Sequence, residues 1–334
     1  MSRWLITGGC GFIGCNLVQQ LLHHGNVVRV IDNLSVGSRS DLQRIHPFVE
    51  HTFGEQQDQK ARHNLELCVG DILDEPFLHS VISGVDVLVH LAANTGVATS
   101  ISDPRSDCST NIVGILNCLE ACRHNGVRRF VYASSSAVLG NCAPPLHEDL
   151  PPHPMSPYGA SKLAGEAYCS AYSQSFGLDC VVLRFGNCYG PLSHHKASVV
   201  AKFINEAIGN EPWQIFGDGK QTRDFVYVDD VVQAIVSAAT FPTIGGDVFQ
   251  IATSCETTVL ELVQELAEVL QTYQIKPPEI TNAPPRVGDV RRNFSNTSKA
   301  RSMLNWTAKV TLREGLERTV RWYLEEHQKF NGAV

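Results

Sequence analysis

Apolar residues in the first part of the chain alternate between short continuous runs and stripes with helical spacing. The runs that predict buried strands lie at 3–7, 27–31, 65–69, 86–91, 129–134 and 180–185. Helical spacing follows the first run, and a longer helix opens at Asp103-Pro104, where aspartate is the cap and proline the first residue. Strands that alternate with helices predict an α/β fold with a doubly wound parallel sheet and right-handed crossovers.

The alternation becomes irregular after Gly186. Thr258-x-x-Glu261 and Thr311-x-x-Glu314 have the form of helix capping boxes, and Gly217-Asp-Gly219 interrupts the pattern. We predict two domains, residues 1–186 with 225–252 partly returning to them, and a smaller C-terminal α/β lobe over 187–330. The polar stretch 43–64 is predicted to hold a short helix and a surface excursion, and no function is assigned to it.

The turn after the first predicted strand carries glycines at 8, 9, 11 and 14. Gly9, Gly11 and Gly14 fit G-x-G-x-x-G, whereas Gly8, Gly11 and Gly14 fit a wider G-x-x-G-x-x-G spacing. At such a turn, backbone N–H groups and the positive end of a helix can approach a pyrophosphate, and a Cβ would block that approach. The pattern predicts a dinucleotide site on a Rossmann-type sheet.

The second predicted strand ends in Asp32, eighteen positions after Gly14. An acidic residue at about this distance accepts hydrogen bonds from a ribose hydroxyl. Because a carboxylate repels a 2′-phosphate, Asp32 favours NAD over NADP.

Tyr158-x-x-x-Lys162 is a second chemical signal. Ser156-Pro157 has the form of a helix cap and first position, so Tyr158 and Lys162 are expected on one helix face. Tyrosine has a pKa near 10, and a fixed ammonium beside it is predicted to favour the phenolate. Ser135, at the end of the preceding strand, is predicted to orient an alcohol substrate and share its proton.

The composition of the chain argues against several classes of binding partner. The chain has 334 residues, 43% of them hydrophobic, and a net charge of −7, which argues against nucleic acid or an anionic membrane as a partner. The first strand begins at Arg3 and leaves no room for a signal peptide, and no apolar run reaches membrane-spanning length. We therefore expect a cytoplasmic protein.

Cysteine and histidine give no sequence signal for a metal. None of the eleven cysteines forms C-x-x-C, so we predict reduced thiols. His194-His195 has no carboxylate or cysteine at ligand spacing along the chain. No metal is predicted, and these histidines are instead candidates to touch a sugar or a phosphate.

The motifs together resemble the extended short-chain dehydrogenase/reductase family, and within it the nucleotide-sugar epimerases and dehydratases. The resemblance runs from about Arg3 to Trp322. It rests on Thr7-Gly-Gly-Cys-Gly-Phe-Ile-Gly14, Asp32-Asn33-Leu34, Gly70-Asp71-Ile72, His90-Leu-Ala-Ala93, Ser134-Ser-Ser136 and Tyr158-x-x-x-Lys162.

The resemblance implies roles residue by residue. It makes Ser135, Tyr158 and Lys162 the catalytic residues, with Lys162 also holding the nicotinamide ribose. The residues it implies for NAD are Gly8, Gly11, Phe12, Ile13, Asp32, Asn33, Asp71, Ile72, Leu91, Ala92, Ala93, Asn111, Tyr158 and Lys162. Those it implies for a nucleotide-diphosphate sugar are Ser135, Ser136, Asn187, Val199, Val200, Arg223 and Arg286, the two arginines clamping the diphosphate.

The resemblance also narrows the reaction. Dehydratases and the related decarboxylase of this family place a glutamate shortly after the strand-end hydroxyl, whereas Ser136 and Ala137 carry no carboxyl here. We therefore predict an isomerase of carbohydrate metabolism, a UDP-hexose or UDP-hexuronate 4-epimerase that works through a 4-keto intermediate. Leu139 stands where the family commonly has tyrosine.

Other interpretations stay open at this point. They are a CDP- or dTDP-sugar epimerase acting at another carbon, a nucleotide-sugar dehydratase or decarboxylase, and a non-catalytic protein that senses NAD for a partner. The resemblance further implies a homodimer formed by the helices that follow residues 103 and 156.

Overall fold

The structure is a computed structural model and describes residues 2–51, 63–195, 198–242, 244–285 and 290–331. Within these residues, eight parallel strands form the main sheet. Their order across the sheet is β12 (Val248–Ile251), β7 (Asp179–Phe185), β6 (Arg129–Ser135), β5 (Val87–His90), β1 (Arg3–Thr7), β2 (Val27–Asp32), β4 (Leu65–Val69) and β3 (Val49–His51).

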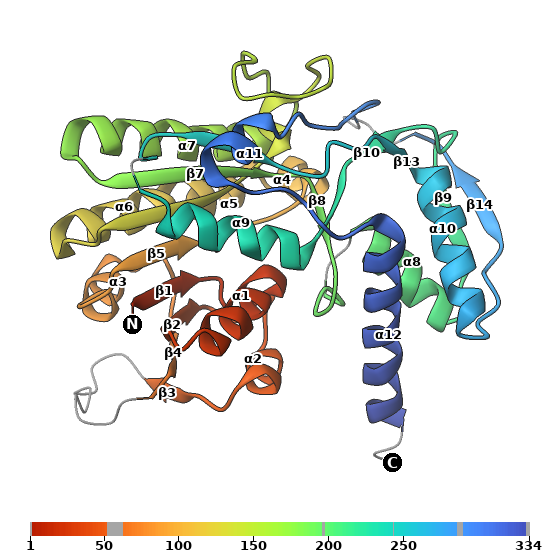
Figure 1. Ribbon diagram of the computed structural model, residues 1–334, viewed down its shortest axis with the longest axis horizontal. Coiled ribbons are helices and arrows are strands. Elements are labelled where there is room, and N and C mark those ends of the chain that lie inside the picture. The colour runs from red at the N-terminus through yellow and green to blue at the C-terminus, as the bar shows by residue number, and fades with distance from the viewer. Residues whose placement is uncertain (1, 52–62, 196–197, 243, 286–289, 332–334) are drawn as a thin grey trace.

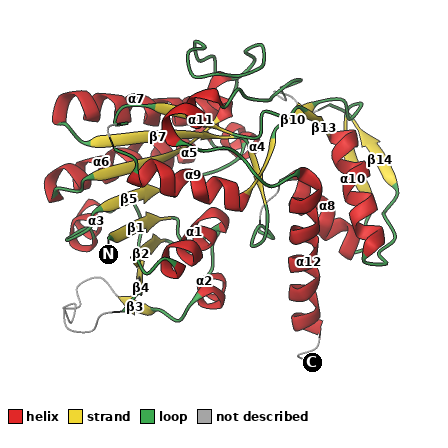
Figure 2. Cartoon of the chain, viewed as in Figure 1, coloured by secondary structure: helices red, strands yellow, loops and turns green. Residues whose placement is uncertain are grey.

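Helices cover both faces of this sheet, and they surround its strands in Figure 2. One core contains side chains of α1 (Phe12–His23), α2 (Arg39–Ile45) and α9 (Val228–Thr240). The other contains side chains of α3 (Glu75–Val81), α6 (Gly114–Asn125) and α7 (Pro157–Phe176). Neighbouring residues of β1 alternate between the two, since Ile6 belongs to the first core and Leu5 to the second. The predicted doubly wound parallel sheet is confirmed.

The direction of winding reverses at the centre of the sheet. From β1 the chain proceeds outward through β2 and β4 on one side, and through β5, β6 and β7 on the other. In sheets of this kind, ligands bind outside the carboxyl ends of the strands at the point where the order reverses. That point is the end of β1 and β5, where Thr7 and His90 lie in register.

The helix predicted to open at Asp103-Pro104 is divided in the structure. The Asp103 side chain caps it by accepting from the Ser106 N–H at 3.0 Å. It continues as α5 (Pro104–Cys108), the π-helical turn η1 (Ser109–Val113) and α6, and α4 (Val97–Ser102) precedes it. Such turns inside helices are frequent at functional sites.

The remaining strands form three small sheets. They are β8 (Asn187–Tyr189) with β11 (Phe225–Tyr227), β9 (Trp213–Phe216) with β14 (Ile280–Ala283), and β10 (Thr222–Arg223) with β13 (Thr257–Thr258). The helices are α8 (Val199–Ile208), α10 (Val259–Thr272), α11 (Ser298–Leu304) and α12 (Leu312–Asn331), and the 3₁₀ turn η2 (Ser136–Leu139) follows β6. Figure 1 shows α8, α10, β9 and β14 together, away from the main sheet.

The predicted domain boundaries remain a prediction that the strand pairing supports. β12 pairs with β7, and α9 packs on α1, so part of 225–252 joins the first domain. The predicted capping box at Thr258 is confirmed in both directions, because Thr258 and Glu261 each bind the other's backbone N–H. None of the described helices has the length and apolar character needed to cross a membrane.

Candidate functional site

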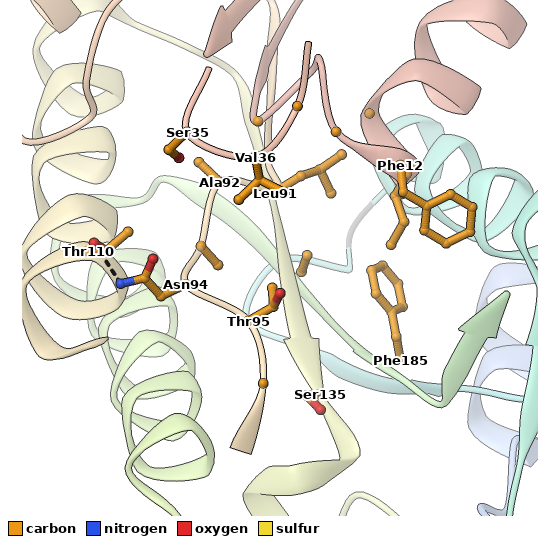
Figure 3. Close-up of a pocket in the computed structure, with 18 of the residues that line it drawn as sticks. Phe12, Ser35, Val36, Leu91, Ala92, Asn94, Thr95, Thr110, Ser135 and Phe185 are labelled. Atoms are coloured by element: carbon orange, nitrogen blue, oxygen red, sulfur yellow. Dashed lines mark hydrogen bonds between the residues drawn. The ribbon is translucent and has the colours of Figure 1, made fainter. Parts of the chain in front are cut away.

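A cavity of about 670 Å³ lies at the carboxyl ends of the central strands. Figure 3 shows the rings of Phe12 and Phe185 on one side of it, and Asn94 and Thr110 on the opposite side. Its walls come from segments far apart in sequence, from the glycine turn after β1 to Ser198, which precedes α8. A cavity of this volume suits a ligand with several rings.

The glycine turn forms the centre of the cavity wall. Gly8 has a φ of +70°, and a Cβ at this residue would lie 2.8 Å from the Ala92 nitrogen and 2.9 Å from its Cα. Gly8 and Gly11 both line the cavity. No side chain caps the start of α1, and its first turn has no acidic residue, so the helix presents its positive end without an internal anion.

Asp32 lies at the end of β2, is 7% exposed and lines the cavity. Its two carboxylate oxygens accept from the backbone N–H groups of Cys10 at 2.9 Å and Leu34 at 2.8 Å. Burial raises the pKa of Asp32, and these two hydrogen bonds partly offset the shift. The carboxylate is therefore fixed in direction, with further lone pairs available to ribose hydroxyls.

A second acidic residue lies beside it. Asp71 accepts from the Asn33 amide at 2.8 Å and from the Leu73 N–H at 2.9 Å. Asn33 and Asp71 both line the cavity. This end of the cavity is rich in fixed acceptors, which suits the hydroxyls and amino group of an adenosine.

The buried Thr7 side chain of β1 contacts the end of β5. The Thr7 hydroxyl accepts from the Ala92 N–H at 3.2 Å and lies 2.9 Å from His90 Nδ1. The His90 ring lies nearly parallel to the rings of Phe130 and Tyr132, with centroids 6.0 and 5.9 Å away, and burial together with the Lys162 charge lowers its pKa to about 3. A neutral His90 thus fixes the strand end, and Leu91, Ala92 and Ala93 line the cavity beyond it.

Asn111 differs from its expected position. It is not among the residues that line the cavity, and it is 2% exposed in the π-helical turn η1. Its amide accepts from the Asn94 N–H at 2.8 Å and donates to the Asn94 carbonyl at 3.0 Å. Asn111 therefore positions the backbone of Asn94, which does line the cavity, because the turn directs its side chain into the protein.

The three predicted catalytic residues converge on the cavity. Ser135 is the last residue of β6, and Tyr158 and Lys162 lie in the first turns of α7, which Ser156 caps by accepting from the Gly159 N–H at 3.1 Å. The Ser135 hydroxyl interacts with the Tyr158 phenol in the direction that lowers the pKa of the phenol. The Lys162 ammonium donates to the Ala133 carbonyl at 2.9 Å and lies 6.0 Å from the centre of the Tyr158 ring.

The pKa shift of Tyr158 differs from the expectation. Burial raises the pKa of Tyr158, with the Ser135 hydrogen bond as the contribution that lowers it, and Lys162 is not among the causes. Burial also lowers the pKa of Lys162 to about 8, against the attraction of Asp107 and Glu166. A lowering of the Tyr158 pKa by Lys162 is not found among these causes, because the ammonium donates to the Ala133 carbonyl and burial has the larger effect on the phenol.

A buried network lies beneath this trio. Glu166, two helical turns after Tyr158, accepts from the Arg184 guanidinium at 2.9 and 2.7 Å and from the Ser134 hydroxyl. All three residues are at most 6% exposed. The network joins α7, β6 and β7 directly behind Ser135, and it fixes the strand that carries this hydroxyl relative to the helix that carries Tyr158.

The residues expected to bind substrate separate into three groups. Ser136 and Asn187 line the cavity. Val199, Val200 and Arg223 do not line it, Val200 because it is 1% exposed in the hydrophobic core at the start of α8. Arg223 donates to the carbonyls of Thr222 at 2.6 Å and Val290 at 2.8 Å. Arg286 lies outside the described residues.

Several cavity residues are not among the predicted site residues, namely Ser35, Val36, Asn94, Thr95, Thr110, Phe185 and Ser198. His195, one of the two histidines predicted as candidates to touch a sugar or a phosphate, does line the cavity. Asn94 and Thr95 directly follow the small-residue segment 91–93 that the resemblance singled out, so continuation of that segment was the available signal. Leu139 is fully buried with Val138 and Leu146 and does not line the cavity.

The residues that line the cavity fit a dinucleotide. The glycine turn leaves backbone space beside an uncapped helix start, and Asp32 supplies a fixed acceptor at the adenosine end. The opposite end brings Ser135, Tyr158 and Lys162 to the same wall. All predicted NAD residues except Asn111 line this one cavity.

Comparisons with known proteins agree with this geometry. The family model described as "NAD dependent epimerase/dehydratase family" matches residues 4–252. The chain is 37% identical to UDP-glucose 4-epimerase of Mycolicibacterium smegmatis, over 98% of this chain and all of that protein. It is 32% identical to UDP-glucuronate 4-epimerase of Thermodesulfobacterium geofontis, over 97% of each chain.

A solved structure extends the agreement to three dimensions. The chain superimposes on UDP-glucose 4-epimerase of Thermotoga maritima, determined with UDP-glucose, with a TM-score of 0.86 and 36% identity. The match covers 97% of this chain and 99% of that one. The predicted family and the predicted cofactor are confirmed together: the chain belongs to the NAD-dependent epimerase/dehydratase family.

Proposed function

We propose that this protein is a UDP-sugar 4-epimerase that inverts C4 of a UDP-hexose such as UDP-glucose or UDP-galactose. One observation carries the proposal: Ser135, Tyr158 and Lys162 meet at a cavity whose reaction end has no carboxylate among the described residues. The carboxylates that line the described cavity are Asp32 and Asp71, both at the adenosine end. The relatives that act on UDP-glucose and UDP-glucuronate support the substrate class.

Tyr158 transfers the proton, and Ser135 and Lys162 hold the groups around it in position. Ser135 holds the substrate hydroxyl beside the Tyr158 phenol, and Tyr158 takes its proton and later returns it. NAD, when bound, supplies reversible acceptance of a hydride. Lys162 holds positive charge at the base of the site, and its ammonium fixes the end of β6 through the Ala133 carbonyl.

The absence of an acid among the described residues of the reaction end favours epimerisation over the other reaction classes. Dehydration and decarboxylation use a group that expels water or assists loss of carbon dioxide, and Ser136 and Ala137 offer none. Return of the hydride to the other face needs no such group. Ser136, which lines the cavity, is instead a hydrogen-bonding partner for the sugar.

A substrate panel tests the proposal. The enzyme is incubated separately with UDP-glucose, UDP-galactose, their N-acetyl forms, the UDP-uronic acids, and CDP and dTDP sugars. The expected result is an equilibrium mixture of C4 epimers of a UDP sugar without net formation of NADH. Irreversible loss of water or carbon dioxide, or inversion at another carbon, would reject the 4-epimerase.

Two properties of the protein follow as proposals. We propose a homodimer formed by the helices that follow residues 103 and 156, because Val113 of η1 and Tyr168 and Phe176 of α7 expose apolar surface. Light scattering on the purified chain tests it, and a monomer contradicts it. We also propose a cytoplasmic location, supported by eleven cysteines that are all unpaired, and cell fractionation tests it.

A further inference from the structure

The fold brings a carboxylate to the two adjacent histidines that showed no partner in the sequence. His195 Nε2 lies 3.3 Å from one oxygen of Asp41, and His194 Nε2 lies 3.7 Å from the other. One candidate ligand atom from each of the three residues falls within 4.8 Å of the others. More than 150 residues separate Asp41 from the histidines, so tertiary structure alone creates this cluster.

We propose that Asp41, His194 and His195 form a binding site for a divalent transition-metal ion, with Zn²⁺ as the best-fitting ion. Imidazole nitrogen and carboxylate oxygen are ordinary zinc ligands, at bonds of about 2.0–2.2 Å. Tetrahedral geometry with such bonds separates neighbouring ligand atoms by about 3.4 Å. The separation of 3.3 Å between His195 Nε2 and its nearer Asp41 oxygen lies close to that value, and His194 Nε2 lies 3.7 Å from the other oxygen of the same carboxylate.

The surroundings favour an ion over a chance surface contact. Asp41 is 4% exposed in the first turn of α2, and the Ser38 hydroxyl donates to its Oδ2 at 2.8 Å, which orients the carboxylate. A second cavity of about 30 Å³ is lined by Asp41 and His195. That space is sufficient for a water molecule, which would complete four-coordination.

Arg44 affects the affinity of the site for a cation. Its Nη1 lies 3.4 Å from Asp41 but 2.7 Å from Glu326 on α12. The stronger contact of the guanidinium is therefore with Glu326, although its charge still opposes a cation beside Asp41. We expect a reversible site of moderate affinity.

The site has a consequence for the main cavity. His195 lines both cavities, and Asp41 belongs to the helix that follows the Asp32 loop. A bound ion therefore ties the segment after β8 to α2 and fixes one wall of the dinucleotide cavity. It touches none of Ser135, Tyr158 and Lys162, so its role is structural.

Binding of Zn²⁺ to the full-length, chelator-treated protein tests the proposal. Calorimetry should give one ion per chain, and Co²⁺ should give the intense visible absorption of a four-coordinate ion. His195→Gln, a half-exposed residue whose replacement spares the core, should weaken binding by more than about tenfold. Asp41→Asn should do the same, and Arg44→Gln should strengthen binding several-fold.

His147→Gln is the matched control, since His147 is also exposed and lies 3.9 Å from a carboxylate, that of Asp149. It should bind Zn²⁺ as the unaltered chain does. Absence of saturable one-to-one binding, or equal affinity in His195→Gln and His147→Gln, overturns the proposal. Melting temperatures with and without Zn²⁺ give a second readout, because the ion should raise that of the unaltered chain and not that of His195→Gln.

Discussion

The two ends of the dinucleotide cavity are built in different ways. At the adenosine end, short contiguous segments supply the wall through their backbone and through carboxylates at strand ends, as with Gly8, Gly11 and Asp32. At the reaction and substrate end, single side chains arrive from η2, α7 and the segments after β7 and β8. Predicted residues line the adenosine end almost completely. At the substrate end, the predicted residues Val199, Val200 and Arg223 do not line the cavity.

The difference has a physical cause. A pyrophosphate is recognised by N–H groups and by the space that glycine leaves, and both are properties of one local turn. A sugar is recognised by side chains that several elements must aim at one point. The first kind of site tolerates little sequence change, and the second changes with the packing of a whole lobe.

The largest expected effect is at the reaction end. Tyr158→Phe should lower the turnover rate by about 10²–10⁴-fold while NAD still binds, because it removes the proton acceptor without altering the glycine turn. Turnover with UDP-galactose and quenching of protein fluorescence by NAD measure the two effects. Tyr168→Phe, on the exposed side of the same helix, should leave both unchanged. Joint loss of NAD binding in Tyr158→Phe would contradict the separation of the two ends.

Removal of the buried charge beneath the reaction end should cost stability. Glu166→Gln leaves the Arg184 guanidinium, 4% exposed, without its ionic partner and should lower the free energy of unfolding by about 3–5 kcal/mol. Glu50→Gln breaks a similar two-point contact with Arg39, but on the surface, and should have a much smaller effect. Urea unfolding compares them, and equal losses would show that the buried network does not support this end.

A matched pair of glycines tests the adenosine end. Gly8 and Gly25 have φ values of +70° and +73°, so alanine imposes the same backbone strain at both. A Cβ at Gly25 meets nothing within 4 Å, whereas one at Gly8 meets the Ala92 backbone. Gly8→Ala should therefore lower the free energy of unfolding by about 1–3 kcal/mol more than Gly25→Ala does, as measured by thermal unfolding. It should also weaken NAD binding. Equal stability and equal NAD binding of the two variants would contradict a role for the close approach of Gly8 to the Ala92 backbone.

The smallest effect concerns pH. His90 has a folded pKa of about 3, below its ordinary value of 6.5, so the unfolded chain binds more protons between these values and stability falls as pH falls below 6.5. At pH 5 the loss is about 2 kcal/mol relative to pH 8, from 1.5 pKa units of 1.36 kcal/mol. His90→Gln should flatten this part of the curve of unfolding free energy against pH. An unchanged slope would assign the acid sensitivity to other groups.

Much of the architecture is readable from local pattern. The strands 3–7, 65–69 and 180–185 lie within one residue of β1, β4 and β7, because a buried parallel strand is a continuous apolar run. The glycine turn, Asp32 and the Tyr158-x-x-x-Lys162 spacing are equally local. The interruption of the long helix at Ser109–Val113 has no comparable signal, since it depends on how Asn111 meets Asn94 and Ser161.

Linear order thus specified the fold, the family and the adenosine end, because each depends on spacings of a few residues that one turn or one helix face converts directly into geometry. Folding alone specified the direction of the pKa shifts of Tyr158 and Lys162, since desolvation is a property of everything packed around a group. It alone also joined Asp41 to His194 and His195, and moved Val200 into the core. Contacts of this kind arise between segments that no sequence spacing relates, and only their packing brings them within a few ångströms.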